Sequence, residues 1–313
     1  MNYVNLYINF LKRFIKIKRP LKVVFDCSNG TAGLILKKLL KAKSYKLKAD
    51  FINSEPDGNF PAHGPNPSKK GALSDLRFAI SKHKVDLGVI FDADGDRAFF
   101  IDNRGRFINP DIIARLLIWH LKPKKVVIGV RTGWLIKKFQ IPSTKLQINS
   151  KFKISISKTG HFFIKKLMKQ KKADFGAERS GHYYFKNFFY AESGILAAIE
   201  VINAVSKLPY SLADFADLLP QYYRSSEISI RCQVSGVRIQ KLLRRIEKKL
   251  KTKSLKLKAR ISHLDGLTIE TKDYWFNIRP SNTEPLIRLN IEAENKKVLQ
   301  REKKRLTALI KKM

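Results

Sequence analysis

Apolar strands that alternate with amphipathic helices are the feature that most constrains how this chain folds, and the alternation occurs twice. The first run has strands at 22–26 and 85–91, a helix ending at 40 and a helix at 72–83. The second run has helices at 111–120, 161–169 and 195–208 and strands at 126–130, 174–178 and 183–185. Strands that alternate with helices form sheets whose faces the helices cover. Each run is therefore expected to form an α/β unit.

The order of elements changes after residue 220. A strand near 227–232 precedes a basic helix at 237–250, further strands follow, and a helix at 296–312 closes the chain. Strands and helices that bunch separately are typical of an α+β domain. Because the chain is longer than one ordinary domain of about 100–150 residues, several domains are expected. The predicted fold class is α/β: two consecutive related α/β domains with mixed sheets, followed by a smaller α+β C-terminal domain.

The domain boundaries are predicted where these patterns change. The segments are a helix at 1–18, α/β domains at 19–107 and 108–220, and the α+β domain at 221–313. Apolar residues of the first segment recur at helical spacing, at Tyr3, Val4, Tyr7, Ile8, Leu11, Phe14 and Ile15. This spacing indicates a packed helix. A targeting presequence is the weaker interpretation, because the segment has no small-residue cleavage pattern.

Composition narrows the class of protein. No window of about 18 residues is both apolar and uncharged, so no membrane span is expected. The two cysteines, Cys27 and Cys232, lie far apart and neither belongs to a CxxC pair. Such usage argues against a disulfide framework or a zinc site and favours a reducing compartment. We therefore expect a cytoplasmic protein with two buried, unreactive thiols.

The chain is strongly basic, with 63 Lys and Arg against 26 Asp and Glu and a net charge of +37. Such an excess occurs in nucleic-acid-binding proteins, where basic side chains release counterions from phosphates. Here the lysines are scattered through every segment instead of forming one cluster. A nucleic acid is therefore not the expected partner, although the charge should attract anionic ligands to any cleft.

The sharpest chemical signal is Asp92-Ala93-Asp94-Gly95-Asp96-Arg97, which follows an apolar strand. Neighbouring carboxylates repel one another unless a cation lies between them. Oxygen-only ligands favour Mg²⁺ or Ca²⁺ over zinc. An EF-hand would need Gly at its sixth position and Glu at its twelfth, where this chain has Arg97 and Asn103. The residues Asp92, Asp94 and Asp96 are therefore predicted metal ligands, with a solvated acidic turn as the alternative.

Three further polar segments are weaker signals when taken singly. Arg279-Pro280-Ser281-Asn282-Thr283-Glu284-Pro285 offers a guanidinium, hydroxyls, an amide and backbone N–H groups, which suit a phosphate dianion but also an ordinary turn. Glu178-Arg179-Ser180-Gly181-His182 can receive sugar hydroxyls or form a plain hairpin. Lys158-Thr159-Gly160-His161 can bind an anion, supply an acid or base, or cap a helix. A proline- and glycine-rich loop at 56–67 is also of a kind that is often functional.

In this order the segments resemble those of the α-D-phosphohexomutase family, most closely its phosphomannomutase/phosphoglucomutase branch. The resemblance runs from about residue 3 to the C-terminus. It pairs the loop at 92–97 with the family's metal loop, 178–182 with its sugar-recognition loop and 279–285 with its phosphate-binding loop. Residues 158–161 and the loop at 56–67 also fall in family order. Enzymes of this family have four domains, of which the first carries a phosphoserine in a Thr-Ala-Ser-His-Asn-Pro type loop.

The resemblance implies roles for individual residues. Asp92, Asp94 and Asp96 would hold Mg²⁺, and Arg97 would offset charge on the moving phosphoryl group. Glu178 and Ser180 would bind sugar hydroxyls with support from His182. Arg279, Ser281, Asn282 and Thr283 would hold the phosphate that is not transferred. His161 would be the acid or base, while Lys158 and Arg131 would contact anions, Arg131 being a looser match because Gly129 stands where the family often has Asp.

The resemblance also implies an activity, the interconversion of hexose 1-phosphate and hexose 6-phosphate through a bisphosphate. The substrate would be a mannose or glucose phosphate. No Thr-Ala-Ser-His-Asn-Pro type segment occurs in the sequence, and residues 1–18 resemble the helix that joins the family's first and second domains. The expectation is a mutase whose serine domain comes from a separate chain or a missing upstream segment. The alternative is a sugar-phosphate-binding remnant without turnover.

Overall fold

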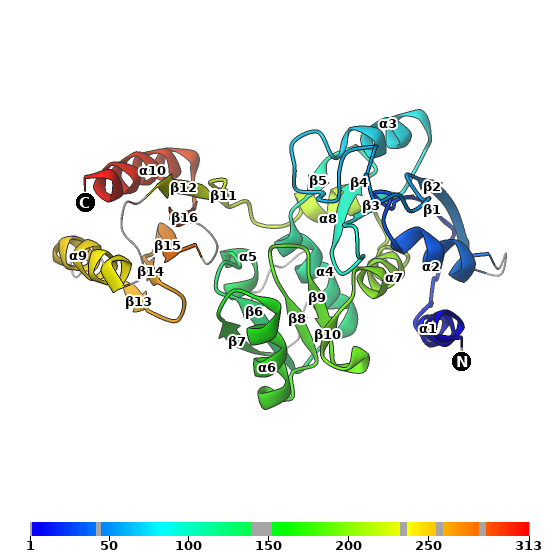
Figure 1. Ribbon diagram of the computed structural model, residues 1–313, viewed down its shortest axis with the longest axis horizontal. Helices are drawn as coiled ribbons and strands as arrows, with labels where there is room; N and C mark the ends of the chain where they lie inside the picture. Colours follow the sequence, from blue (N-terminus) through cyan, green and yellow to red (C-terminus); the bar gives the residue numbers. More distant parts are fainter. Residues whose placement is uncertain are drawn as a thin grey trace. The chain divides into compact units, whose positions relative to one another are not determined.

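A computed structural model describes residues 2–41, 45–138, 152–231, 237–254, 259–281 and 286–312 (Figure 1). Within these ranges the chain forms two compact units. The first comprises Met1–Ser155 and Gly160–Leu219, and the second comprises Ile156–Thr159 and Pro220–Met313. No helix among the described residues is both long enough and apolar enough to cross a membrane.

The first run of strands and helices folds into a five-stranded mixed sheet. Its strands are β1 (Leu21–Asp26), β2 (Leu47–Ile52), β3 (Leu87–Phe91), β4 (Ala98–Asp102) and β5 (Phe107–Ile108), in the order β2-β1-β3-β4-β5. β1 runs parallel to β2 and β3, whereas β4 runs antiparallel to β3 and β5. Its helices are α2 (Ala32–Leu39) and α3 (Ser74–Lys82). All five residues of β3 are buried, as expected for a central strand that is covered on both faces.

The second run forms another five-stranded sheet with the same strand order. Its strands are β6 (Lys125–Gly129), β7 (Lys153–Ser157), β8 (Phe175–Ala177), β9 (Tyr183–Phe185) and β10 (Ala191–Glu192). The order β7-β6-β8-β9-β10 repeats the first sheet strand for strand, with β6 and β8 parallel and β8 and β9 antiparallel. Its helices are α4 (Pro110–Leu121), α5 (Trp134–Lys137), α6 (His161–Lys171), the 3-10 turn η1 (Lys186–Phe188), α7 (Gly194–Val205) and α8 (Leu212–Asp217). The prediction of two related α/β domains with mixed sheets is confirmed.

One hydrophobic core runs through both sheets and fixes them to each other. It includes Phe25 and Phe91 from the first sheet and Phe175 from the second. Every residue of α7 is buried, and Ser193 caps the start of this helix by accepting a hydrogen bond from the Leu196 N–H at 3.1 Å. Loops at the ends of the two sheets are therefore held in a fixed arrangement.

The N-terminal helix α1 (Tyr3–Lys12) is shorter than the predicted segment at 1–18. The chain leaves the helix because the Lys16 N–H donates to the Asn203 side chain at 2.8 Å and the Lys18 N–H donates to Ser206 at 2.9 Å. Ile8 and Leu11 are buried, but Tyr3 is 75% exposed. Only part of the predicted apolar face is thus packed.

The second unit contains an antiparallel sheet with two helices. The strands are β11 (Tyr223–Arg224), β12 (Ile228–Arg231), β13 (Arg260–Ser262), β14 (Leu267–Glu270), β15 (Tyr274–Pro280) and β16 (Leu286–Ala293), and the helices are α9 (Val237–Ser254) and α10 (Lys296–Lys311). The order is β11-β16-β15-β14-β13, and β12 also pairs with β16. Ile246 of α9 and Leu306 of α10 are fully buried in its core. This arrangement confirms the α+β prediction.

Candidate functional site

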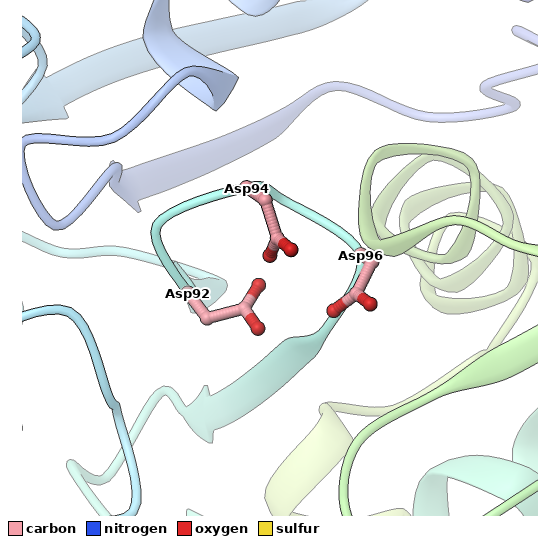
Figure 2. Close-up of side chains that lie close together, drawn as sticks. All are labelled: Asp92, Asp94 and Asp96. Atoms are coloured by element: carbon pink, nitrogen blue, oxygen red, sulfur yellow. The ribbon is translucent and has the colours of Figure 1, made fainter. Parts of the chain in front are cut away.

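The acidic loop at 92–97 connects β3 to β4 and brings its three carboxylates together. One side-chain oxygen from each of Asp92, Asp94 and Asp96 lies within 4.8 Å of the other two. Figure 2 shows the three side chains pointing into the space that the loop encloses. The turn closes because the Gly95 N–H donates to the Asp92 carbonyl at 3.2 Å, with Gly95 at a positive φ of 73° that glycine adopts without strain.

The electrostatics of this loop fit a hard divalent cation. Burial raises the pKa of Asp92 to about 6, even though Arg97 hydrogen-bonds both of its carboxylate oxygens. Burial alone would also raise the pKa of Asp96, but the hydrogen bonds with His182 and Asp92 and the charges of His182 and Arg97 together outweigh it and lower that pKa. Oδ1 of Asp96 is buried and has no hydrogen-bond partner among the described residues. An oxygen-only ligand set with an unsatisfied buried oxygen suits Mg²⁺ or Ca²⁺.

The predicted sugar-recognition loop, 178–182, connects β8 to β9 and therefore occupies the same place in the second sheet as the acidic loop does in the first. The two loops touch. The Ala98 N–H donates to the Gly181 carbonyl at 3.1 Å, and Arg97 and His182 form an antiparallel bridge. Nε2 of His182 lies 3.5 Å from Oδ2 of Asp96, while its Nδ1 lies 2.9 Å from the Ser180 hydroxyl. Predicted metal ligands and predicted sugar ligands thus share one site.

Glu178 is more enclosed than a loop residue usually is, since only 5% of it is exposed. Its Oε1 accepts a hydrogen bond from the Gly160 N–H at 3.1 Å. Its Oε2 accepts one from the Tyr184 hydroxyl at 2.7 Å. The carboxylate is therefore held from two sides, by a backbone N–H of the predicted 158–161 segment and by a tyrosine hydroxyl that the sequence gives no reason to single out.

His161 is the first residue of α6, and Glu192 holds it near the sugar loop. Its Nδ1 lies 3.5 Å from Oε1 of Glu192, and Lys165, one turn along the helix, lies 3.0 Å from Oε2. The imidazole is 60% exposed, so it is open to a ligand. Lys158 is exposed on the segment before the helix, and Arg131 is half-buried on the loop that follows β6.

The predicted phosphate-binding loop lies in the second unit, between β15 and β16. Arg279 is 7% exposed and its Nη2 lies 3.6 Å from Oε2 of Glu227, whose other oxygen accepts from Arg288 at 2.6 Å. The Ser281 N–H donates to the Leu286 carbonyl at 2.8 Å and joins the two sides of the loop. Asn282 and Thr283 lie outside the described residues.

The proline-rich loop at 56–67 packs its backbone on the acidic loop. The Ala93 N–H donates to the Pro65 carbonyl at 3.2 Å. His63 anchors this loop, because its Nε2 lies 3.1 and 3.2 Å from the two oxygens of the fully buried Asp26. Burial raises the pKa of Asp26, although hydrogen bonds from the Ser28 N–H, His63 and Asn53 oppose the rise. Sequence reasoning marked this loop as functional but missed the Asp26–His63 pair.

Models of one protein family match the chain in order. "Phosphoglucomutase/phosphomannomutase, alpha/beta/alpha domain II" matches residues 5–105, domain III of the same family matches 109–223, and its C-terminal domain matches 230–309. A phosphomannomutase of Methanocaldococcus jannaschii is 34% identical, over 100% of this chain and 68% of that protein. A phosphomannomutase of Escherichia coli K12 is 31% identical, over 94% of this chain and 63% of that protein. The chain thus spans about two thirds of the length of these relatives.

Solved structures show the same fold. A phosphoglucomutase/phosphomannomutase family protein from Burkholderia thailandensis superposes with a TM-score of 0.81 at 23% identity, over 98% of this chain and 64% of that one. The Aspergillus fumigatus N-acetylphosphoglucosamine mutase, in complex with GlcNAc-6P and magnesium, has a TM-score of 0.69 at 14% identity, over 98% and 69% of the two chains. Together with the relatives and the matching family models, these findings establish that the chain belongs to the phosphoglucomutase/phosphomannomutase family.

Proposed function

We propose that this chain forms the ion- and sugar-binding part of a Mg²⁺-dependent phosphohexomutase that interconverts hexose 1-phosphate and hexose 6-phosphate through a bisphosphate. The observation that carries the proposal is the 3.5 Å approach of His182 to Asp96, which joins a convergent carboxylate triad to a loop rich in hydroxyl-binding groups. The relatives at 31–34% identity are phosphomannomutases, which supports a hexose phosphate as the substrate.

In this proposal Asp92, Asp94 and Asp96 hold the cation. A bound Mg²⁺ offsets the negative charge that accumulates on a transferring phosphoryl group. Arg97 adds a second positive charge beside the same loop. Its Nε–H donates to one oxygen of Asp92 and its backbone N–H donates to the other, so the guanidinium is held in place and little reorganisation is needed when the phosphoryl group arrives.

The sugar is bound by the loop of the second sheet. Glu178 accepts hydrogen bonds from sugar hydroxyls through the lone pairs that Gly160 and Tyr184 leave free. Ser180 binds another hydroxyl, and His182 supports Ser180 through Nδ1. His161 is the proposed acid or base, because its exposed imidazole stands at the edge of this loop.

Anionic groups of the substrate are met by basic side chains. Arg279, Ser281, Asn282 and Thr283 hold the phosphate that is not transferred, and Lys158 and Arg131 make weaker anion contacts. Arg279 suits this role because a guanidinium binds phosphate through two parallel N–H donors. Its contact with Glu227 orients the side chain before the phosphate binds.

The phosphoryl donor is part of the proposal too. The 313 residues contain no Thr-Ala-Ser-His-Asn-Pro type segment, so the phosphoserine would come from residues outside this sequence, on the same polypeptide or a second chain. We further propose a cytoplasmic location, which is supported by a cysteine pattern of two distant residues without a CxxC pair. The proposed domain boundaries fall after residues 18, 107 and 220.

Binding tests this proposal without requiring turnover. Calorimetric titration of the chain with glucose 1,6-bisphosphate in Mg²⁺ should give saturable binding that weakens when Mg²⁺ is removed. Arg279→Ala should weaken that binding, whereas Arg260→Ala, an exposed arginine on β13, should leave it unchanged. Absence of saturable binding, or equal effects of the two variants, would contradict the proposed function.

The alternative candidate is a sugar-phosphate-binding protein without turnover. Phosphorus NMR of the chain with mannose 1-phosphate, the bisphosphate and Mg²⁺ separates the two candidates. Isomerisation by this chain alone rules out the second. Activity that arises only when a phosphoserine-bearing domain is added supports the first.

A further inference from the structure

Tyr184 closely follows the predicted sugar-recognition loop in the sequence and is closed off from solvent. It is the central residue of β9, and its side chain is fully buried. Its hydroxyl donates to Oε2 of Glu178 at 2.7 Å, a short hydrogen bond of the kind that forms with a charged acceptor. Burial first, and then the adjacent negative charge of Glu178, strongly raise the pKa of Tyr184, so the hydroxyl remains a donor.

The hydrogen bond matters because Glu178 would otherwise be poorly fixed. A glutamate has three rotatable side-chain bonds, and a free one samples many rotamers. Here Tyr184 holds Oε2 and the Gly160 N–H holds Oε1, so both oxygens keep a defined direction. Gly160 precedes His161 at the start of α6. The glutamate therefore links the sugar loop to the helix that carries the proposed acid or base.

We propose that Tyr184 is a positioning residue, which acts through Glu178 to aim its remaining acceptor sites at the substrate and to hold the first turn of α6 against the sugar loop. This inference rests on the proposed function for its substrate, but the contact with Gly160 gives it a consequence that needs no substrate. The loss of the hydroxyl should release the Gly160 N–H as well as weaken ligand binding.

The neighbouring Tyr183 is a matched control. It lies on the same strand and is also fully buried, but its hydroxyl has no hydrogen-bond partner among the described residues. Tyr184→Phe and Tyr183→Phe each remove one hydroxyl and keep the ring. Any effect of losing a buried oxygen in general should appear in both variants, whereas a positioning effect should appear only in Tyr184→Phe.

Amide hydrogen exchange of the folded chain is the first measurement. The Gly160 N–H should exchange faster in Tyr184→Phe than in wild type and at the wild-type rate in Tyr183→Phe. In a Glu178→Ala background, Tyr184→Phe should add nothing, because the tyrosine then has no carboxylate to hold. The inference would be overturned if the Gly160 N–H exchanges at the wild-type rate in Tyr184→Phe. It would also be overturned if Tyr183→Phe increases that rate as much as Tyr184→Phe does.

Titration with glucose 1,6-bisphosphate in Mg²⁺ is the second measurement. Tyr184→Phe should bind about 10-fold more weakly than wild type, as expected for loss of a hydrogen bond to a charged group, and Tyr183→Phe should bind equally well. If wild type binds and Tyr184→Phe binds as tightly, the positioning role is wrong. If wild type itself does not bind, the proposed function fails, and the exchange result alone decides the role of Tyr184.

Discussion

Nε2 of His182 lies 3.5 Å from Oδ2 of Asp96, so the predicted sugar-recognition loop of one sheet and the acidic loop of the other meet side chain to side chain. The contact does not depend on the histidine alone. The backbone bridge between Arg97 and His182 and the hydrogen bond from the Ala98 N–H to the Gly181 carbonyl fix the same junction. A substitution in either loop should therefore change the affinity of the other loop for its ligand.

Asp94→Asn should weaken Mg²⁺ binding at least about tenfold, because it replaces one of three convergent anionic ligands with a neutral amide. The fold should survive, since Asp94 is the exposed member of the triad. Calorimetry measures the affinity, and a thermal melt without metal tests the fold. Asp273→Asn, a change of the same charge at an exposed site in the second unit, is the control. Equal Mg²⁺ affinity in wild type and Asp94→Asn would contradict the prediction that Asp94 is a metal ligand.

Gly194→Ala should displace the acidic loop, because Gly194 at the start of α7 lies directly against its backbone. A Cβ on Gly194 would lie 2.6 Å from the Arg97 carbonyl oxygen and 2.7 Å from that of Gly95. Backbone atoms cannot turn aside as a side chain can, so the acidic loop must shift. We expect a loss of about 1–3 kcal/mol in the free energy of unfolding, together with weaker Mg²⁺ binding.

Gly58→Ala is the matched control for that substitution, because a Cβ there meets no atom within 4 Å. Urea unfolding of both variants, followed by Mg²⁺ titration, makes the comparison. If Gly194→Ala is as stable as Gly58→Ala and binds Mg²⁺ as tightly, the close approach of α7 to the acidic loop contributes neither to stability nor to Mg²⁺ binding.

His63→Ala should destabilise the fold by about 1–3 kcal/mol, because it leaves the buried Asp26 carboxyl group without one of its hydrogen-bond partners. Loss of this anchor should also make the proline-rich loop more sensitive to proteases. His83→Ala removes an exposed imidazole from the same α/β unit and is the control. Limited proteolysis and urea unfolding provide the measurements. Wild-type stability in His63→Ala would show that the pair is incidental.

Cys27 should be chemically inert while the protein is folded. Burial, and then the neighbouring charge of Asp26, raise the pKa of its thiol to about 12. The neutral thiol therefore favours the fold at pH values below its unfolded pKa of about 8.5, and this contribution is lost as the pH rises toward 12. In a Cys232→Ser variant, Ellman's reagent at about pH 8 should modify Cys27 only at the rate of unfolding. Rapid modification of the folded variant would contradict this expectation.

The sequence was sufficient to predict the order of elements, because hydrophobic periodicity follows directly from which faces are buried. The strand at 183–185 and the helix starting at His161 match the structure at those positions. Its weakest prediction was the length of the first helix. Apolar residues continue at helical spacing to Ile15, but the helix ends at Lys12. Beyond it, the Lys16 N–H donates a hydrogen bond to the Asn203 side chain of α7. Tertiary contacts of this kind override local periodicity.

The sequence indicates which loops carry the candidate residues but not which side chains pair with each other. The clustering of Asp92, Asp94 and Asp96 is local and therefore visible in the sequence. The hydrogen bond from Tyr184 to Glu178 was not visible, because every residue of β9 is buried and alternation gives no indication of which hydroxyl has a partner. The Asp26–His63 pair joins residues that are 37 positions apart, a separation that only the folded chain specifies.

The shared strand order of the two sheets gives the site an internal pseudosymmetry. The acidic loop and the predicted sugar-recognition loop each connect the third strand of their sheet to the fourth, so one structural position, used twice, provides both halves of the candidate site. The two positions carry different side chains, three carboxylates in one and Glu178, Ser180 and His182 in the other. In the proposed function, a change in the accepted sugar can therefore arise from substitutions in one of the two loops, while the loop proposed to bind the ion stays the same.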